Sequence, residues 1–146
     1  WGEVTQVSFL LENGADVNQV DYRMATPLHY ASETGKADIC QLLLDRGANA
    51  NPAYQTGWTP LHIASDRGYL DICKLLMKHG ADQSLAEEGD TPIEVARGKA
   101  NYDIEDYFDH ISAMVYTLHA RSKGERHHVL VLLPLDLLKR VFEAFL

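Results

Sequence analysis

A hexapeptide that recurs at a nearly constant spacing is the feature that most limits how this chain can fold. It reads TPLHYA from Thr26, TPLHIA from Thr59 and TPIEVA from Thr91. The first two copies start 33 residues apart and the last two start 32 residues apart. A period of this length is typical of stacked repeats, in which each unit contacts its neighbours. The pattern therefore predicts an array that offers a binding surface and has no reaction centre.

Each copy of the hexapeptide is expected to begin a helix. Thr can cap the free N–H groups of the first turn, and Pro fits the first helical position because its missing N–H would have no partner there. Apolar residues then recur at helical spacing. Gly35 and Gly68 are placed to end these helices, and a second apolar helix is expected to run from there to Gly47 or Gly80. Each unit is therefore predicted to be a pair of helices.

The period and the TPLH motif make the region from about residue 2 to residue 112 resemble the ankyrin-repeat family. The resemblance implies an all-α solenoid with β-hairpin fingers at right angles to the helices, followed by a C-terminal helical extension. The implied divisions are a half repeat at 1–25, repeats that begin at residues 26, 59 and 91 within an array at 1–112, and an extension or cap at 113–146.

Both ends of the array carry further expectations. Gly2 falls in register with Gly35 and Gly68, so the first helix of the leading unit is expected to lie before Trp1. At the other end Ser112 stands where the earlier units have a stop glycine. The last helix is therefore expected to run on into residues 113–119.

The family resemblance implies a non-catalytic module that binds a protein partner through finger tips and the concave face of the first helices. Exposed Tyr, Trp and Arg are also the residues enriched in binding hot spots. The candidate contact residues are Tyr22, Arg23, Tyr54, Gln55, Trp58, Glu87 and Glu88 on the fingers, and Tyr30, Glu33, Ile63, Asp66 and Arg67 on the helices. The alternative is that Tyr54 and Trp58 only pack neighbouring fingers.

Two positions depart from the repeat. Met24 stands where the other fingers have Gly57 and Gly89, so a left-handed backbone there would be costly. Glu94 replaces the histidine of the motif. The first finger is therefore expected to be strained or differently shaped.

Charge is unevenly distributed along the chain, whose net charge is −8. Residues 1–112 carry eight Lys and Arg against 18 Asp and Glu, whereas residues 113–146 carry five against three. An acidic array disfavours nucleic acid, because phosphates are repelled, and favours a partner with a basic patch. The alternative is a solvated acidic surface that keeps the array soluble.

Nothing in the sequence indicates catalysis, a cofactor or a metal. His29 and His62 belong to the repeat motif, and no Cys-x-x-Cys or His-x-x-x-His pair accompanies them. No glycine-rich phosphate loop is present. An enzyme would need a buried cluster of His, Asp or Glu in the folded protein.

Cysteine use and hydropathy indicate the compartment. Cys40 and Cys73 occupy the same repeat position, on helices expected to pack about 8–10 Å apart. This separation disfavours a disulfide and predicts reduced thiols, which fits a cytoplasmic or nuclear protein. The apolar run at 129–135 is far shorter than the roughly 20 residues of a membrane span.

Asn18 and Asn51 begin the finger loops, each eight residues after a leucine. In the ankyrin family such asparagines resemble sites of β-hydroxylation. The alternative is a structural role in satisfying backbone groups of the finger. A +16 Da mass on protein isolated from cells would reveal the modification.

The segment LPLDLLKRVFEAFL at 133–146 predicts an amphipathic helix opened by Pro134. Its first part, LPLDLLKRVF, resembles the opening of an F-box, and the longer segment GERHHVLVLLPLDLLKRVF at 124–142 resembles the end of a SOCS box. Either resemblance implies a substrate adaptor of a cullin ubiquitin ligase. The alternatives are a cap on the last repeat, another partner contact, or a structural subunit of a larger assembly. The possible adaptor contacts are Leu133, Pro134, Leu137, Leu138, Val141 and Phe142.

Overall fold

The computed structural model describes residues 2–85 and 90–122 of the chain. In this part of the chain the regular secondary structure is α-helical, as the family resemblance predicted. Two compact units, Trp1–Glu105 and Asp106–Leu146, are described separately. The helices are α1 (Glu3–Glu12), α2 (Pro27–Glu33), α3 (Ala37–Asp45), α4 (Pro60–Arg67), α5 (Leu70–Lys78), α6 (Pro92–Gly98) and α7 (Tyr102–Ser122).

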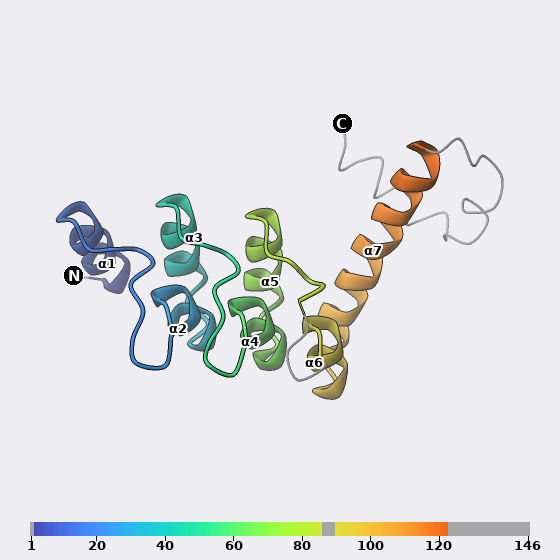
Figure 1. The fold of residues 1–146 in the computed structure, drawn as a ribbon, viewed down its shortest axis with the longest axis horizontal. Helices are drawn as coiled ribbons and strands as arrows, with labels where there is room; N and C mark the ends of the chain where they lie inside the picture. The colour runs from blue at the N-terminus through green and yellow to red at the C-terminus, as the bar shows by residue number, and fades with distance from the viewer. Residues whose placement is uncertain (1, 86–89, 123–146) are drawn as a thin grey trace. The chain divides into compact units, whose positions relative to one another are not determined.

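The helices of the first unit alternate between two rows (Figure 1). The inner helices are α2, α4 and α6, which the Thr-Pro pairs open, and the outer helices are α1, α3 and α5. α2 packs on α4 and α4 packs on α6, while α1 packs on α3 and α3 packs on α5. α2 and α4 also contact the outer helix that follows each of them. The predicted helix pairs are therefore confirmed.

The core of this unit is a row of repeat-equivalent side chains. Leu28 and Leu61 are fully buried, and Ala64 lies beside them with no exposed surface. Full burial of a leucine side chain stabilises a fold by roughly 1.5–3 kcal/mol relative to its exposure. Since the same positions recur in each repeat, the core continues from one unit to the next.

A capping interaction fixes the start of each inner helix. The backbone N–H of Thr26 donates to Nδ1 of His29 at 3.0 Å, and the second repeat has the same arrangement. In the third repeat Glu94 Oε2 accepts the N–H of Thr91 at 2.7 Å. The third repeat therefore keeps the capping hydrogen bond and changes only its acceptor, because the Glu94 carboxylate replaces the imidazole nitrogen.

The fingers differ from the predicted β-hairpins, since the described residues contain no β-strand. The first finger is closed by backbone hydrogen bonds from Asp21 to the carbonyl of Ala25 and from Met24 to the carbonyl of Asp21, both at 3.0 Å. The second is closed in the same way, from Tyr54 to the carbonyl of Trp58 at 3.0 Å and from Gly57 to the carbonyl of Tyr54 at 2.8 Å. Only a few residues separate the hydrogen-bonded residues of each finger, so each finger is a tight turn and not a pair of β-strands.

The last helix of the array extends as the missing stop glycine predicted. α7 runs from Tyr102 to Ser122 and passes residue 112 without a break. The predicted helix at 133–146 lies outside the described residues.

Met24 adopts the left-handed backbone that its position requires. Its φ is +64°, and φ is +85° at Gly57, the equivalent residue of the second finger. A residue with a Cβ loses roughly 1–2 kcal/mol in this conformation. About half of the Met24 side chain is exposed, so little packing offsets this cost. The first finger is therefore strained, as the sequence predicted.

We expect Met24→Gly to raise the free energy of unfolding by about 0.5–1 kcal/mol, because glycine adopts a positive φ without a clash. Urea denaturation followed by circular dichroism measures the change. Gln6→Gly, at an exposed position of α1, is the matched control and should lower stability by about 1 kcal/mol. Equal losses in the two variants would contradict the assignment of strain to Met24.

Candidate functional site

The structure brings four predicted contact residues together at the tip of the first finger. The fingertip cluster consists of Asp21, Tyr22, Arg23, Tyr30 and Gln55. The guanidinium of Arg23 lies 5.6 Å from the centre of the Tyr22 ring and donates to the Tyr30 hydroxyl at 3.0 Å. The Tyr22 side chain is 83% exposed. An exposed aromatic ring is therefore held beside a cation in a defined geometry.

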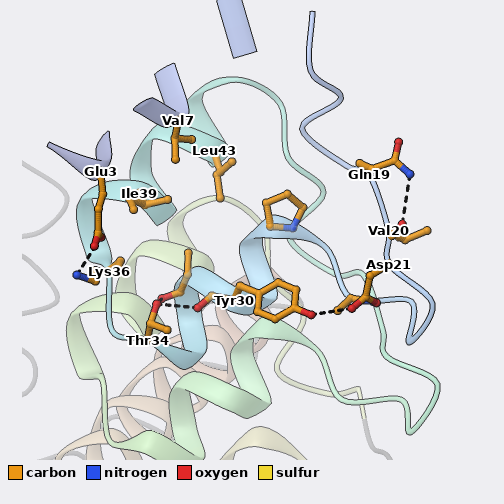
Figure 2. Close-up of a pocket in the computed structure, with 13 residues that line it drawn as sticks. Glu3, Val7, Gln19, Val20, Asp21, Tyr30, Thr34, Lys36, Ile39 and Leu43 are labelled. Carbon is orange, nitrogen blue, oxygen red and sulfur yellow. Dashed lines mark hydrogen bonds and ion pairs between the residues drawn. The ribbon is translucent and has the colours of Figure 1, made fainter. Parts of the chain in front are cut away.

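Asp21 organises this cluster, although sequence reasoning did not select it. One carboxylate oxygen accepts the backbone N–H groups of Arg23 and Ala25, and the other accepts the Tyr30 hydroxyl at 2.6 Å (Figure 2). These hydrogen bonds, that of Tyr30 first, lower the pKa of Asp21. An Asp that opens a tight turn commonly bonds backbone groups two residues on, and this signal could have identified it.

Gln55 connects the first two fingers. Its side chain donates to the carbonyl of Tyr22 at 3.0 Å, and its backbone N–H donates to the carbonyl of Arg23 at 3.2 Å. Both bonds reach across one repeat. The tips of the two fingers are therefore fixed relative to each other.

Tyr54 and Trp58 pack against histidines of the inner helices. The Tyr54 ring stacks on the buried His29 ring with centroids 4.2 Å apart, and Trp58 lies 6.1 Å from the ring of His62. Both side chains are half-buried. These contacts give both residues a packing role, and contact of Tyr54 and Trp58 with a partner stays a prediction.

Ion pairs connect successive inner helices. Arg67 donates to Glu33 at 2.9 Å, and Lys99 lies 3.0 Å from Asp66. All four side chains are partly exposed, so each pair contributes only about 0–1 kcal/mol to stability. Their main effect is to set a fixed pattern of charge on the exposed side of the inner helices.

Some predicted contact residues are not available on this surface. Ile63 is only 5% exposed, because it packs between helices of the array, so it belongs to the core. Glu87 and Glu88 lie outside the described residues, as do the predicted adaptor contacts within 133–142. Contact through those acidic residues and through the tail stays a prediction.

His29 joins the start of α2 to the second finger through its two ring nitrogens. Since Nδ1 accepts the Thr26 N–H, the neutral ring carries its proton on Nε2, which lies 3.2 Å from the carbonyl of Trp58. The ring is fully buried. Burial lowers the pKa of His29 below its ordinary value of 6.5, because the charged ring would lose its hydration. This histidine is a structural link, as the motif implied.

The asparagines of the finger loops have the structural role that was the alternative to modification. The Asn51 side chain accepts the backbone N–H of Asp82 at 2.8 Å and donates to the carbonyl of Gly80 at 3.0 Å. Asn18 bonds the next repeat in the same way, to Asn49 and Gly47. Hydroxylation of Asn18 or Asn51 stays a prediction.

Both cysteines are buried free thiols, as their spacing predicted. Burial raises the pKa of Cys40 to about 11 and that of Cys73 to about 12. Thiolates are therefore scarce at neutral pH, and these cysteines are poor nucleophiles. Within residues 2–85 and 90–122, no group of three His, Cys, Asp or Glu side chains could hold a metal ion. No helix in this described part combines the length and apolar character needed to cross a membrane.

Comparison with known proteins agrees with this geometry. The family model for ankyrin repeats (3 copies) matches residues 2–87 and 47–107. No curated protein shows significant similarity to the chain. Ankyrin-repeat domains are typically protein–protein interaction modules and are generally non-catalytic.

We expect the free energy of unfolding to fall as the pH is lowered below about 6.5. The pKa of His29 is lower in the folded state, so the unfolded chain takes up a proton first. The stabilisation is complete above the unfolded pKa and is lost as the pH falls toward the folded one. Urea midpoints between pH 8 and pH 5 measure this dependence.

The variant for this test is His29→Gln, which keeps an acceptor for the N–H of Thr26 but does not titrate. Its stability should change less between pH 7 and pH 5 than that of the natural chain. Ser32→Ala, a buried change on the same helix, should lower the free energy of unfolding at every pH without changing how it depends on pH. If His29→Gln leaves the pH dependence of the free energy of unfolding unchanged, His29 is not its source.

Asn51→Ala is expected to lower the free energy of unfolding by about 1–2 kcal/mol, because it leaves Asp82 N–H and Gly80 C=O without their partner. Asn51→Asp keeps the acceptor and should cost less. Thermal and urea denaturation measure both changes. A neutral Asn51→Ala would show that water replaces these bonds.

Proposed function

The chain belongs to the ankyrin-repeat family, and we propose that it binds a protein partner through the fingertip cluster and the exposed side of its inner helices. The observation that carries the proposal is the fixed position of Tyr22 and Arg23 at an exposed tip. Tyr and Arg are enriched among the residues that dominate binding energy. Most of the Tyr22 surface faces solvent, so its ring is accessible to a partner.

The hydrogen bonds around the cluster support this proposal because they order it before binding. Asp21 and Tyr30 hold Arg23 from one side, and Gln55 holds the backbone of Tyr22 and Arg23 from the other. Ordering a long side chain at an interface costs about 0.5–1.5 kcal/mol. In the folded array these hydrogen bonds order the Arg23 side chain before the partner binds, so less free energy is lost on binding.

The proposed partner presents a basic patch next to an apolar or aromatic one. The array carries an excess of acidic residues, with 18 Asp and Glu against eight Lys and Arg in residues 1–112. Complementary charge of this kind speeds association and excludes other acidic proteins. Arg23 and Arg67 are each held by a carboxylate, so the cations of the surface are locally balanced.

The test replaces Tyr22 and Arg23 together with alanine. Partner proteins captured from cell extract by the natural chain are identified by mass spectrometry, and the affinity of the purified partner is measured by calorimetry. The double variant should bind at least about 30-fold more weakly, as expected for two hot-spot residues. Its melting temperature should change by less than about 3 °C, since both side chains are exposed.

The matched control is Asp38→Ala with Lys78→Ala, which changes two exposed residues of the outer helices. It should leave the affinity unchanged. Equal affinity of the natural chain and the Tyr22 and Arg23 variant would refute the fingertip contact. Equal losses in both double variants would show that the loss is not specific to the fingertip.

A further inference from the structure

One dipeptide of the chain, Asn13-Gly14, combines chemical reactivity with an open position in the fold. The chain has five asparagines, and glycine follows only Asn13. A backbone nitrogen can attack the side-chain carbonyl of the asparagine before it, and a side chain on the attacking residue hinders this approach. Glycine has no Cβ, so Gly14 brings the least hindrance and the greatest backbone freedom to the reaction.

The dipeptide lies where α1 ends and the loop to the first finger begins. Asn13 is the C-cap residue of the helix, with φ −96° and ψ +18°. Gly14 has φ +90°, a left-handed conformation that suits glycine after a helix. Both residues are exposed. A Cβ on Gly14 would meet no atom of residues 2–85 and 90–122 within 4 Å, so the space beside this peptide bond is open.

The exposure of this turn does not depend on what precedes α1. Gly47 holds the same place after α3, a helix that packs on α1 and on α5. Gly47 is exposed too, and its φ of +86° is close to that of Gly14. A neighbouring outer helix on each side therefore leaves the equivalent turn open to solvent.

The other four asparagines are engaged by their neighbours. Asn18 and Asn51 bond the next repeat through both polar atoms of their side chains. Asn49 accepts the backbone N–H of Asn51, and Asn101 donates to two carbonyls of α4. A residue with a Cβ follows each of the four, and after Asn51 that residue is proline, which has no N–H to lose.

The end of α1 has to open before Asn13 and Gly14 react. The N–H of Gly14 donates to the carbonyl of Leu11 at 3.2 Å. The Asn13 side chain donates to the carbonyl of Phe9 at 2.7 Å. These bonds engage the nitrogen that attacks and the amide that is attacked. Both lie exposed at a helix end, where local opening costs little free energy, so the fold slows the reaction without blocking it.

We propose that Asn13 is a site of spontaneous deamidation. The Gly14 nitrogen forms a bond to Cγ of Asn13, and the side-chain nitrogen leaves as ammonia together with the proton of that N–H. Water then opens the resulting succinimide ring at one of its two carbonyls. One opening gives aspartate, and the other gives isoaspartate, in which the backbone runs through the former side chain. Water is the only co-reactant, and the reaction is separate from the fingertip contact.

The product places a negative charge at the unfavourable end of α1. A helix C-terminus favours cations, and the equivalent residues of the next two repeats are Arg46 and His79. A carboxylate at position 13 lies next to Glu12 in the chain and cannot donate to the carbonyl of Phe9 as the amide does. Deamidation is therefore expected to destabilise the turn that leads from α1 to the first finger.

The test follows the purified full chain by mass spectrometry during incubation at neutral pH and body temperature. Fragments that contain Asn13 should gain about 1 Da at least about 10-fold faster than those that contain Asn18, Asn49 or Asn101. Electron-transfer fragmentation should detect isoaspartate beside aspartate, because the ring opens on both sides. The rate should increase with pH, since the Gly14 nitrogen attacks after it loses its proton.

Two controls separate the chemistry of the dipeptide from the effect of the fold. Asn13→Gln should abolish the mass gain at this position, because a six-membered ring closes more slowly. In urea the rate at Asn13 should rise, since the helix end is already open. An unchanged rate in urea would contradict protection by α1. No gain at Asn13, or equal gains at all the asparagines, would overturn the proposal.

The consequence for stability is measured with a variant that carries the product from the start. Asn13→Asp should lower the melting temperature by about 2–5 °C. Asn49→Asp is the matched control, because it adds the same charge at an exposed position and keeps the acceptor for the N–H of Asn51. It should change the melting temperature by less than about 1 °C. Equal losses would contradict the assignment to the end of α1, and no part of the test involves a partner protein.

Discussion

The architecture of the array depends on one imidazole in each of its first two repeats. His29 accepts the N–H that starts its own helix and reaches the carbonyl of Trp58 in the next finger. The same ring carries Tyr54 on its face. A buried ring with two ring nitrogens suits this task, because one nitrogen accepts while the other donates. One side chain therefore holds both the start of its helix and the finger that follows.

The surface of the array depends on this coupling between units. Repeat proteins have few contacts between distant parts of the chain, so order is transmitted from neighbour to neighbour. Gln55 from one finger fixes the tip of the preceding one, and Arg67 from one helix pairs with Glu33 of the preceding one. Since each element of the proposed binding surface is completed by the next repeat, a change in one unit alters the surface of two.

The hexapeptide was sufficient to predict the inner helices, whose first residues are Pro27, Pro60 and Pro92. Local chemistry governs these features, because a capping residue, a proline and a required positive φ act within a few residues. The positive φ at Met24 could be predicted for the same reason. The exposed fraction of individual side chains could not be predicted from the hexapeptide, because it depends on contacts with neighbouring units. Ile63 and Tyr30 share a repeat position, but Ile63 is 5% exposed and Tyr30 is 40% exposed.

Differences between equivalent positions are therefore more informative than the repeat itself. Where Ile63 is aliphatic and buried, Tyr30 carries a hydroxyl that bonds Asp21 and Arg23. That hydroxyl joins α2 to the fingertip cluster, since Tyr30 lies on the helix and Asp21 and Arg23 lie in the finger. One substitution at a repeat position therefore couples the inner helix to the order of the finger.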